Sequence, residues 1–221
     1  MISIEINSNP FTQSETLPIF TIMITTIWLI ITLTSLYTYG WRKTFRYLVP
    51  IMIASLFLEA SAIANGRYHY PDYLIYINLL GANVPFIILL GWSVNLFIFT
   101  KLSEYTITLI YNKINHIHTL LVASYTGVIG VCIDLLEDPI AHHNKWWIWT
   151  GEPLNMNIYG VPLSNFLDWF LILFFMSLTT LLIDQAKISE NKKLILSIIS
   201  VSYTGAIIFI SHYLLVELLS L

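Results

Sequence analysis

Three acidic residues, Asp134, Glu137 and Asp138, stand together at the end of an apolar run that covers about residues 117–136. Their spacing of three and four residues places them on one face of a helix, and Pro139 is expected to limit how far that helix continues. Three adjacent acids cannot all be comfortably ionised, so at least one is expected to hold a proton or to have a cationic partner. An acid in that state can donate a proton at neutral pH.

Simpler interpretations stay open for each of these acids. Glu137 and Asp138 could be ordinary charges at headgroup level where a helix ends. Asp134 and Glu59 both lie inside apolar runs, and they could form a structural polar contact between helices. Against this stands the general rule that ionisable residues within a membrane are costly and most often functional.

A metal site is a further chemical alternative. Glu59, Asp134, Asp138, His142 and His143 offer the carboxylate and imidazole groups that suit iron, manganese or zinc. Adjacent histidines do not reproduce the Glu-x-x-His pair of di-metal bundles or the His-Glu-x-x-His motif. The sequence therefore predicts no metal, and because it has no glycine-rich phosphate loop it predicts no other cofactor.

The elements that hold these residues are transmembrane helices. The 221 residues are 57% hydrophobic and only 10% charged, with a mean hydropathy of +0.74, which is outside the range of soluble domains. A crossing uses about 20 apolar residues, so a single integral membrane domain occupies residues 1–221. The fold class expected is an all-α polytopic bundle. The net charge of −3 argues against a nucleic acid partner, and nothing in the sequence defines the oligomeric state.

About six transmembrane spans are expected, and the basic residues orient them. The spans are residues 17–39, 45–64, 79–100, 117–136, 162–183 and 194–219. Only Arg67 and Lys145 lie in the even-numbered connections. The other basic residues lie in or beside the odd-numbered connections: Arg42, Lys43, Arg46, Lys101, Lys113, Lys187, Lys192 and Lys193. By the positive-inside rule the odd connections are cytoplasmic, so both termini are expected on the extracytoplasmic side.

With that topology, the polar residues of the spans fall on the outer side. Glu59 is about fourteen residues into the second span, roughly 21 Å from its inner boundary at ~1.5 Å per residue. Asn83 opens the third span, Asp134 closes the fourth, and Asn165 lies in the first turn of the fifth. Several helices thus bring carboxylates and amides to one level, and we expect them to form a polar pocket there.

The pattern of these residues resembles a known family. It consists of Glu59, Gly66-Arg-Tyr-His-Tyr70, Asp134-x-x-x-Asp138-Pro139, Trp146-Trp-Ile-Trp149 and Tyr159-Gly-Val-Pro-Leu-Ser-Asn-Phe-Leu-Asp-Trp169. Over about residues 59–170 it is similar to the carotenoid biosynthesis membrane proteins, which include bisanhydrobacterioruberin and gamma-carotene hydratases. One departure is Asp168, which stands where a small residue is expected.

The resemblance implies a hydro-lyase of the carotenoid 1,2-hydratase type, a multi-pass protein of the cell membrane that adds water across a terminal C=C bond of a lipophilic polyene or isoprenoid. Protonation of such an alkene gives a tertiary carbocation, which needs a desolvated acid, electron-rich faces and one controlled water. The expected catalytic residues are Asp134 or Asp138 as the proton donor and Glu59 with Asn165 to orient the water. The expected substrate-binding residues are Tyr68, Tyr70, Trp147 and Tyr159, which would shield the cation, together with Asn83 and His142.

Two alternatives from other classes remain. One is a different isoprenoid- or lipid-modifying membrane enzyme on the same scaffold, because a fold does not fix a reaction. The other is a proton-coupled carrier that uses the same carboxylates. Carriers usually place their site near the midplane within broken helices, whereas these acids cluster toward one face.

Overall fold

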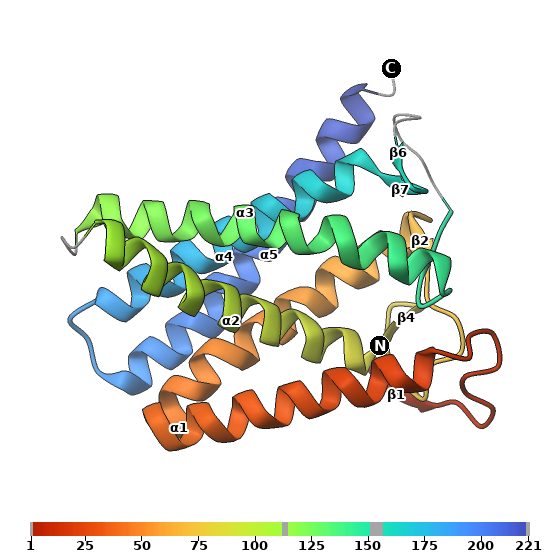
Figure 1. Ribbon diagram of the computed structural model, residues 1–221, viewed down its shortest axis with the longest axis horizontal. Coiled ribbons are helices and arrows are strands. Elements are labelled where there is room, and N and C mark those ends of the chain that lie inside the picture. The colour runs from red at the N-terminus through yellow and green to blue at the C-terminus, as the bar shows by residue number, and fades with distance from the viewer. Residues whose placement is uncertain (1, 112–114, 151–156, 220–221) are drawn as a thin grey trace.

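The computed structural model describes residues 2–111, 115–150 and 157–219, with side chains throughout except at 204–206 and 208–219. Five helices make up most of the described chain and pack as a bundle (Figure 1). Their bounds are α1 Leu17–Ala64, α2 Phe86–Ile110, α3 His116–His143, α4 Leu163–Gln185 and α5 Glu190–Leu219. Of these, α1 to α4 are each long and apolar enough to cross a membrane.

The first two expected spans, residues 17–39 and 45–64, are the two halves of α1. They meet at Gly40, whose backbone dihedrals (φ 76°, ψ 167°) are accessible to glycine and strained for other residues. The two halves run in opposite directions beyond this bend (Figure 1). Ser35 and Thr44 join them across it with a 2.9 Å hydrogen bond between their hydroxyls.

Two of the expected boundaries are wrong. The third span was placed at residues 79–100, but α2 begins at Phe86, because the residues before it pair as strands. Asn83 therefore lies in a strand and does not open a helix. The fourth span was placed at residues 117–136, with Pro139 expected to limit the helix beyond it, yet α3 continues through Pro139 to His143. A proline inside a helix removes one backbone hydrogen bond, and here the turn beyond it is held by the Asn144 N–H to Ile140 and the Trp146 N–H to Ala141.

The chain is mostly helical, as the expected all-α fold class requires, and short strands supplement the bundle. Antiparallel pairing joins β1 (Ile2–Ile6) to β3 (Ile75–Leu79) and β3 to β4 (Ala82–Pro85). Two smaller pairs are β2 (Tyr68–His69) with β5 (Ile148–Trp149) and β6 (Asn157–Ile158) with β7 (Val161–Pro162). All lie at the end of the bundle where the chain begins (Figure 1). Connections here carry peptide groups that need partners, and strand pairing supplies them.

Helices α3 and α4 pack closely against each other. Gly127 and Gly130 of α3 face α4 so closely that a Cβ added at Gly127 would lie 2.8 Å from the Phe170 ring, and one added at Gly130 would lie 2.0 Å from Leu173 Cδ1. Small residues allow such an approach between helices in a membrane. The α3 residues that follow are thereby brought within reach of the start of α4.

Candidate functional site

Two aspartates one turn apart on α3 share a single amide from α4. Asp134 and Asp138 are 0% and 3% exposed. Asn165, in the first turn of α4, donates its side-chain N–H groups to Asp134 Oδ2 at 2.8 Å and to Asp138 Oδ2 at 2.5 Å. The other oxygen of Asp134, Oδ1, is buried with no hydrogen-bond partner among the described residues. We call Asp134, Asp138 and Asn165 the aspartate pair and its amide.

No lysine or arginine in the described part of the chain forms an ion pair with either aspartate. Arg67, which reaches the same end of α4, pairs instead with Asp168 at 2.9 Å. Two carboxylates side by side in a low-dielectric interior cannot both be ionised without a cationic partner. The pair therefore holds a proton. The pairing with Arg67 also accounts for Asp168 at the position where the resemblance gives a small residue.

Glu59, in the second half of α1, accepts three hydrogen bonds. Tyr68 and Tyr70 donate their hydroxyls to Oε2 at 2.6 and 2.7 Å, and the Trp92 indole N–H donates to Oε1 at 2.7 Å. Burial raises the pKa of both phenols well above the usual tyrosine range, and the nearby charge of Glu59 adds to that rise. Both therefore remain protonated. An indole can only donate, so this cradle of three donors is suited to a carboxylate.

Local structure explains how the two tyrosines reach Glu59. The strand β2 pairs with β5, which sets Tyr68 opposite Trp149, and their rings meet edge to face at 4.8 Å between centroids. Tyr70 lies edge to face against Tyr68 at 5.5 Å. Aromatic pairs at these distances contribute about 0.5–1.5 kcal/mol beyond the area they bury. This short sheet therefore closes over the end of α1 and fixes both hydroxyls.

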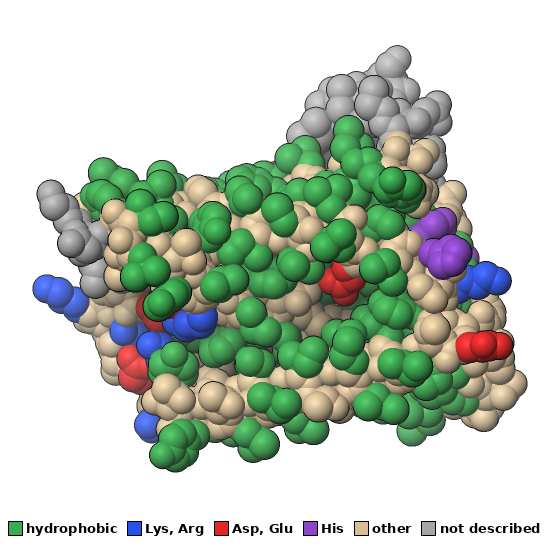
Figure 2. Space-filling view, viewed as in Figure 1, with side chains coloured by type: hydrophobic (Ala, Val, Ile, Leu, Met, Phe, Trp, Pro, Cys, Tyr) green, Lys and Arg blue, Asp and Glu red, His purple; other side chains and the backbone are tan. Residues whose placement is uncertain are grey.

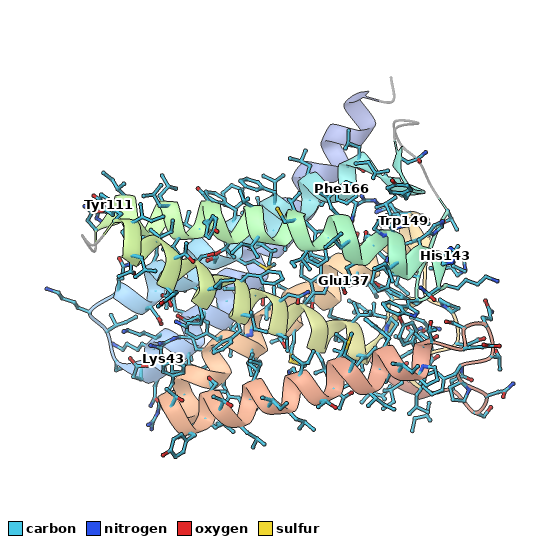
Figure 3. The ribbon with its side chains drawn as sticks, in the orientation of Figure 1. Lys43, Tyr111, Glu137, His143, Trp149 and Phe166 are labelled. Carbon is cyan, nitrogen blue, oxygen red and sulfur yellow. The ribbon has the colours of Figure 1, made fainter. Side chains whose placement is uncertain are left out.

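The Glu59 cradle, Asp138 and Asn165 border one pocket. It lies between both halves of α1, the first turns of α2, the last turns of α3 and the start of α4; Figure 3 marks this region with Glu137, Trp149 and Phe166. Carboxylates line one part of the pocket and indole and phenol rings line much of the rest. The lining is Phe20, Ile24, Glu59, Tyr68, Tyr70, Ile87, Ile88, Gly91, Trp92, Asn95, Glu137, Asp138, Trp147, Trp149, Asn165 and Trp169.

Most of the residues expected from the sequence meet in this pocket. Its lining includes Glu59, Asp138, Asn165, Tyr68, Tyr70 and Trp147. Asp134 is not part of the lining and joins the pocket through Asn165.

The structure does not bring the other three expected residues to the pocket. Asn83 is exposed in β4, where it accepts a 2.7 Å hydrogen bond from Asn78. Tyr159 is 84% exposed in the turn between β6 and β7. His142 lies beneath that turn, close to Gly160.

Several lining residues were not expected. Trp92 and Trp169 lie in the middle of apolar runs, and their rings are 4.6 Å apart across the pocket region. Each ring extends its apolar run, so hydropathy does not mark it as part of a pocket. Glu137 was expected to face water at headgroup level, but it lines the pocket beside Asp138.

Metal-ligand geometry is not found in this region. Among the described residues, no three His, Cys, Asp or Glu side chains are grouped as they would be around a metal ion. His142 and His143 lie at the end of α3, and neither lines the pocket with Glu59 and Asp138.

Comparison with known proteins gives one match. The model of a family described as carotenoid biosynthesis protein matches residues 17–220, nearly the whole chain. No curated protein and no solved structure matches.

Proposed function

Because the chain belongs to the carotenoid biosynthesis protein family, a family of membrane proteins that act on carotenoids, we propose that it hydrates a terminal C=C bond of a polyene. The observation that carries the proposal is the pocket in which Asp138, one member of a proton-holding aspartate pair, and a separate, donor-cradled glutamate border the same apolar and aromatic space. Hydration needs an acid, a base and a place for a carbocation between them.

Asp138 is the proton donor in this proposal. It lines the pocket, whereas Asp134 lies behind it and is held by the same amide. Asp138 gives its proton to the less substituted carbon of a terminal trisubstituted alkene. The π electrons form the new C–H bond, and the other alkene carbon becomes a tertiary cation. Asn165 keeps the two aspartates together, since both of its hydrogen bonds go to them.

Aromatic faces stabilise the cation. A positive charge within about 6 Å of an indole or phenol ring is attracted to its π face. Tyr68, Tyr70 and Trp147 border the space beside Asp138, and Trp92 with Trp169 adds a second pair of rings. Tyr159, first expected to serve this purpose, lies too exposed for it.

Glu59 is the base. Its carboxylate is held by three donors at 2.6–2.7 Å and orients the attacking water. The water oxygen forms the C–O bond with the cation, and Glu59 takes the proton that this water releases. Water in the pocket returns the proton to Asp138. One water is added and no net proton is consumed, so no cofactor has to supply electrons.

The orientation in the membrane is part of the same proposal. Six crossings follow if the two halves of α1 cross separately and α5 also crosses, with both termini extracytoplasmic in the cell membrane. Most lysine and arginine side chains gather at the end of the bundle opposite the N-terminus and the pocket (Figure 2); Lys113 lies outside the described residues. The positive-inside rule puts that end in the cytoplasm, so the pocket lies toward the outer face.

The test is hydration of a supplied polyene, followed as a gain of 18 mass units by mass spectrometry. Asp138→Asn is expected to lower the rate roughly 10²–10⁴-fold, the usual range for removing a general acid. Glu59→Gln is expected to lower it through loss of the base. Glu104→Gln is the matched control, because Glu104 pairs with Lys101 at the other end of α2, away from the pocket.

Other outcomes separate the remaining possibilities. Full activity in both Asp134→Asn and Asp138→Asn removes the proposed mechanism. A polyene altered by a different mass indicates another isoprenoid modification by the same pocket. Unchanged lipids in cells with and without the protein favour a carrier.

A further inference from the structure

Glu137 lies in a part of α3 that otherwise faces lipid. Ile133 and Ile140 lie one turn before and one turn after it and are 39% and 51% exposed, and the adjacent Leu136 is 65% exposed; we call these three the lipid-facing stripe. Glu137 itself is half-buried and lines the pocket. Figure 2 shows an acidic side chain set in a hollow among apolar ones, at the place where Figure 3 labels Glu137.

The hollow follows from how the helices diverge. The two helices α2 and α3 are joined at the cytoplasmic end of the proposed topology and separate toward the pocket (Figure 1). Where they separate, α2 presents Ile87, Ile88 and Gly91 to the pocket, and the first half of α1 presents Phe20 and Ile24. Gly91 of α2 faces Ile24 of α1 at an ordinary packing distance, since a Cβ added there would be 3.9 Å from Ile24 Cγ2. One side of this opening is apolar, and Glu137 is the acid on the other.

The carboxyl of Glu137 is costly at this position. In the described part of the chain it has no hydrogen bond and no ion pair with another residue. An ionisable group that faces hydrocarbon without a partner lowers stability, and such groups are usually kept for a purpose. The Glu137 carboxyl could accept a hydrogen bond from the hydroxyl of an alcohol that passes between the pocket and the bilayer.

We propose that the pocket opens sideways into the bilayer at Glu137, that an isoprenoid end group enters and leaves between α3 and the first half of α1, and that Glu137 accepts a hydrogen bond from the hydroxyl of the departing alcohol. The assignment of the alcohol rests on the proposed hydration. The sideways opening requires only that the ligand be an isoprenoid hydrocarbon dissolved in the membrane.

The opening is tested without catalysis by spin labels in the full-length protein in phospholipid bilayers, with Cys132 replaced by alanine. A nitroxide at Glu137→Cys is expected to collide more with oxygen, which concentrates in hydrocarbon, than with a water-soluble nickel chelate. Leu136→Cys is the lipid-facing reference, and Glu5→Cys, exposed in β1, is the water-facing reference. If Glu137→Cys does not fold, a label at Ile24→Cys, on the α1 side of the opening, replaces it and is expected to show the same preference for oxygen over the nickel chelate.

Squalane, a saturated isoprenoid hydrocarbon with no double bond to react, then serves as the probe. It is expected to slow the motion of the labels at positions 137 and 24 at least twofold and to leave the label at 136 unchanged. Preferential contact of label 137 with the nickel chelate, or no effect of squalane on labels 137 and 24, overturns the sideways opening.

The hydroxyl contact is tested by kinetics. Glu137→Leu is expected to lower steady-state turnover about tenfold more than it lowers the first turnover, the effect of one lost hydrogen bond to a charged group. Glu137→Gln still has an accepting oxygen and is expected to lose less. Equal steady-state rates in wild type and Glu137→Leu overturn the contact. The two proposals can fail separately. If the labels respond to squalane but the protein adds no water to a polyene, the sideways opening is supported and the proposed hydratase activity is overturned.

Discussion

At the scale of single residues, the acids of the pocket differ in their hydrogen-bond partners. Glu59 receives three donors, two of them phenols whose pKa burial has raised. The aspartates share one amide, Asp138 has a further hydrogen-bond partner in the Trp147 indole, and neither has an ion pair with a cation within the described chain. Acids in such different surroundings take different proton-transfer roles, as in other enzymes that use two carboxyl groups. The proposed assignment of base and acid therefore rests on these partners more than on the residue types.

The raised pKa of Tyr68 and Tyr70 predicts how stability responds to alkali. In the unfolded chain a tyrosine ionises near pH ~10, but in the folded protein it does so only at higher pH. Their contribution to stability is fully present below about pH 10 and is lost as the pH rises through the folded-state pKa. The thermal unfolding midpoint in detergent should therefore fall above about pH 10. The double variant Tyr68→Phe, Tyr70→Phe should fall less steeply.

Tyr37→Phe provides the matched control, since Tyr37 is 94% exposed. It should follow the wild-type pH profile. A double variant with the same slope as wild type would show that the two phenols are not the protected groups.

The acids of the pocket were predictable from the sequence, whereas the rings opposite them were not. Asp134, Asp138 and Glu59 interrupt apolar runs, where a charge is conspicuous. Trp92 and Trp169 add to an apolar run instead of interrupting it, so their position in the pocket depends on packing that only the structure shows. Tyr159 was expected in the pocket because it stands in an aromatic-rich segment with pocket residues, and this expectation was wrong. Trp147 of this segment is buried, whereas Tyr159 is exposed, and closeness in sequence does not distinguish the two.

At the scale of elements, the distance between α3 and α4 determines whether one amide can reach two carboxyls. Gly127 and Gly130 set that distance, and Asp134 follows Gly130 by one turn. Larger residues at the two glycines would move α4 outward together with Asn165. The aspartate pair would then lose the donor that holds it together.

This spacing predicts the effect of a single methyl group. Gly130→Ala puts a Cβ 2.0 Å from Leu173 Cδ1, a fully buried side chain, and overpacking of this kind costs about 1–3 kcal/mol. The variant should unfold at lower temperature and hydrate more slowly. Gly91→Ala is the matched control, because its Cβ would meet Ile24 at an ordinary 3.9 Å. Its unfolding temperature should match or exceed the wild-type value.

If Gly130→Ala unfolds at the wild-type temperature, the close packing of α3 on α4 does not limit stability. A lower unfolding temperature in both variants would mean that the helices tolerate no added methyl at all. Neither result is compatible with a distance set specifically by the α3 glycines.

Element boundaries show where hydropathy stops being informative. Ile75, Ile77 and Leu79 alternate with polar or aromatic residues, which is the period of a strand. A hydropathy average ignores that period, so the third span was expected to begin inside the β3–β4 hairpin. Pro139 gave the opposite error, because it was expected to end a helix that in fact continues. A proline is a local signal, and the hydrogen bonds that continue α3 beyond it come from Asn144 and Trp146 further along the chain.

At the scale of the whole molecule, most of the basic residues lie at one end of the bundle and the pocket lies at the other. The end away from the pocket is held by ion pairs of Arg46 with Asp184 and Glu190, and Lys101 and Lys193 join the same network. Arg46 is 2% exposed, so this network ties the bend in α1 to the link between α4 and α5. In the proposed orientation the basic residues anchor the bundle at the cytoplasmic face, and the pocket end presents its opening in the outer leaflet.

Orientation is therefore the property on which the function depends most directly. A cysteine at Glu5 in a Cys132→Ala protein should react with a membrane-impermeant maleimide in intact cells, because β1 lies at the pocket end. A cysteine at Lys187, exposed between α4 and α5, should react only after the membrane is opened. The reverse pattern would put the pocket at the cytoplasmic face. Glu137 would then open to the inner leaflet, and the hydroxyl formed in the pocket would emerge among the inner headgroups.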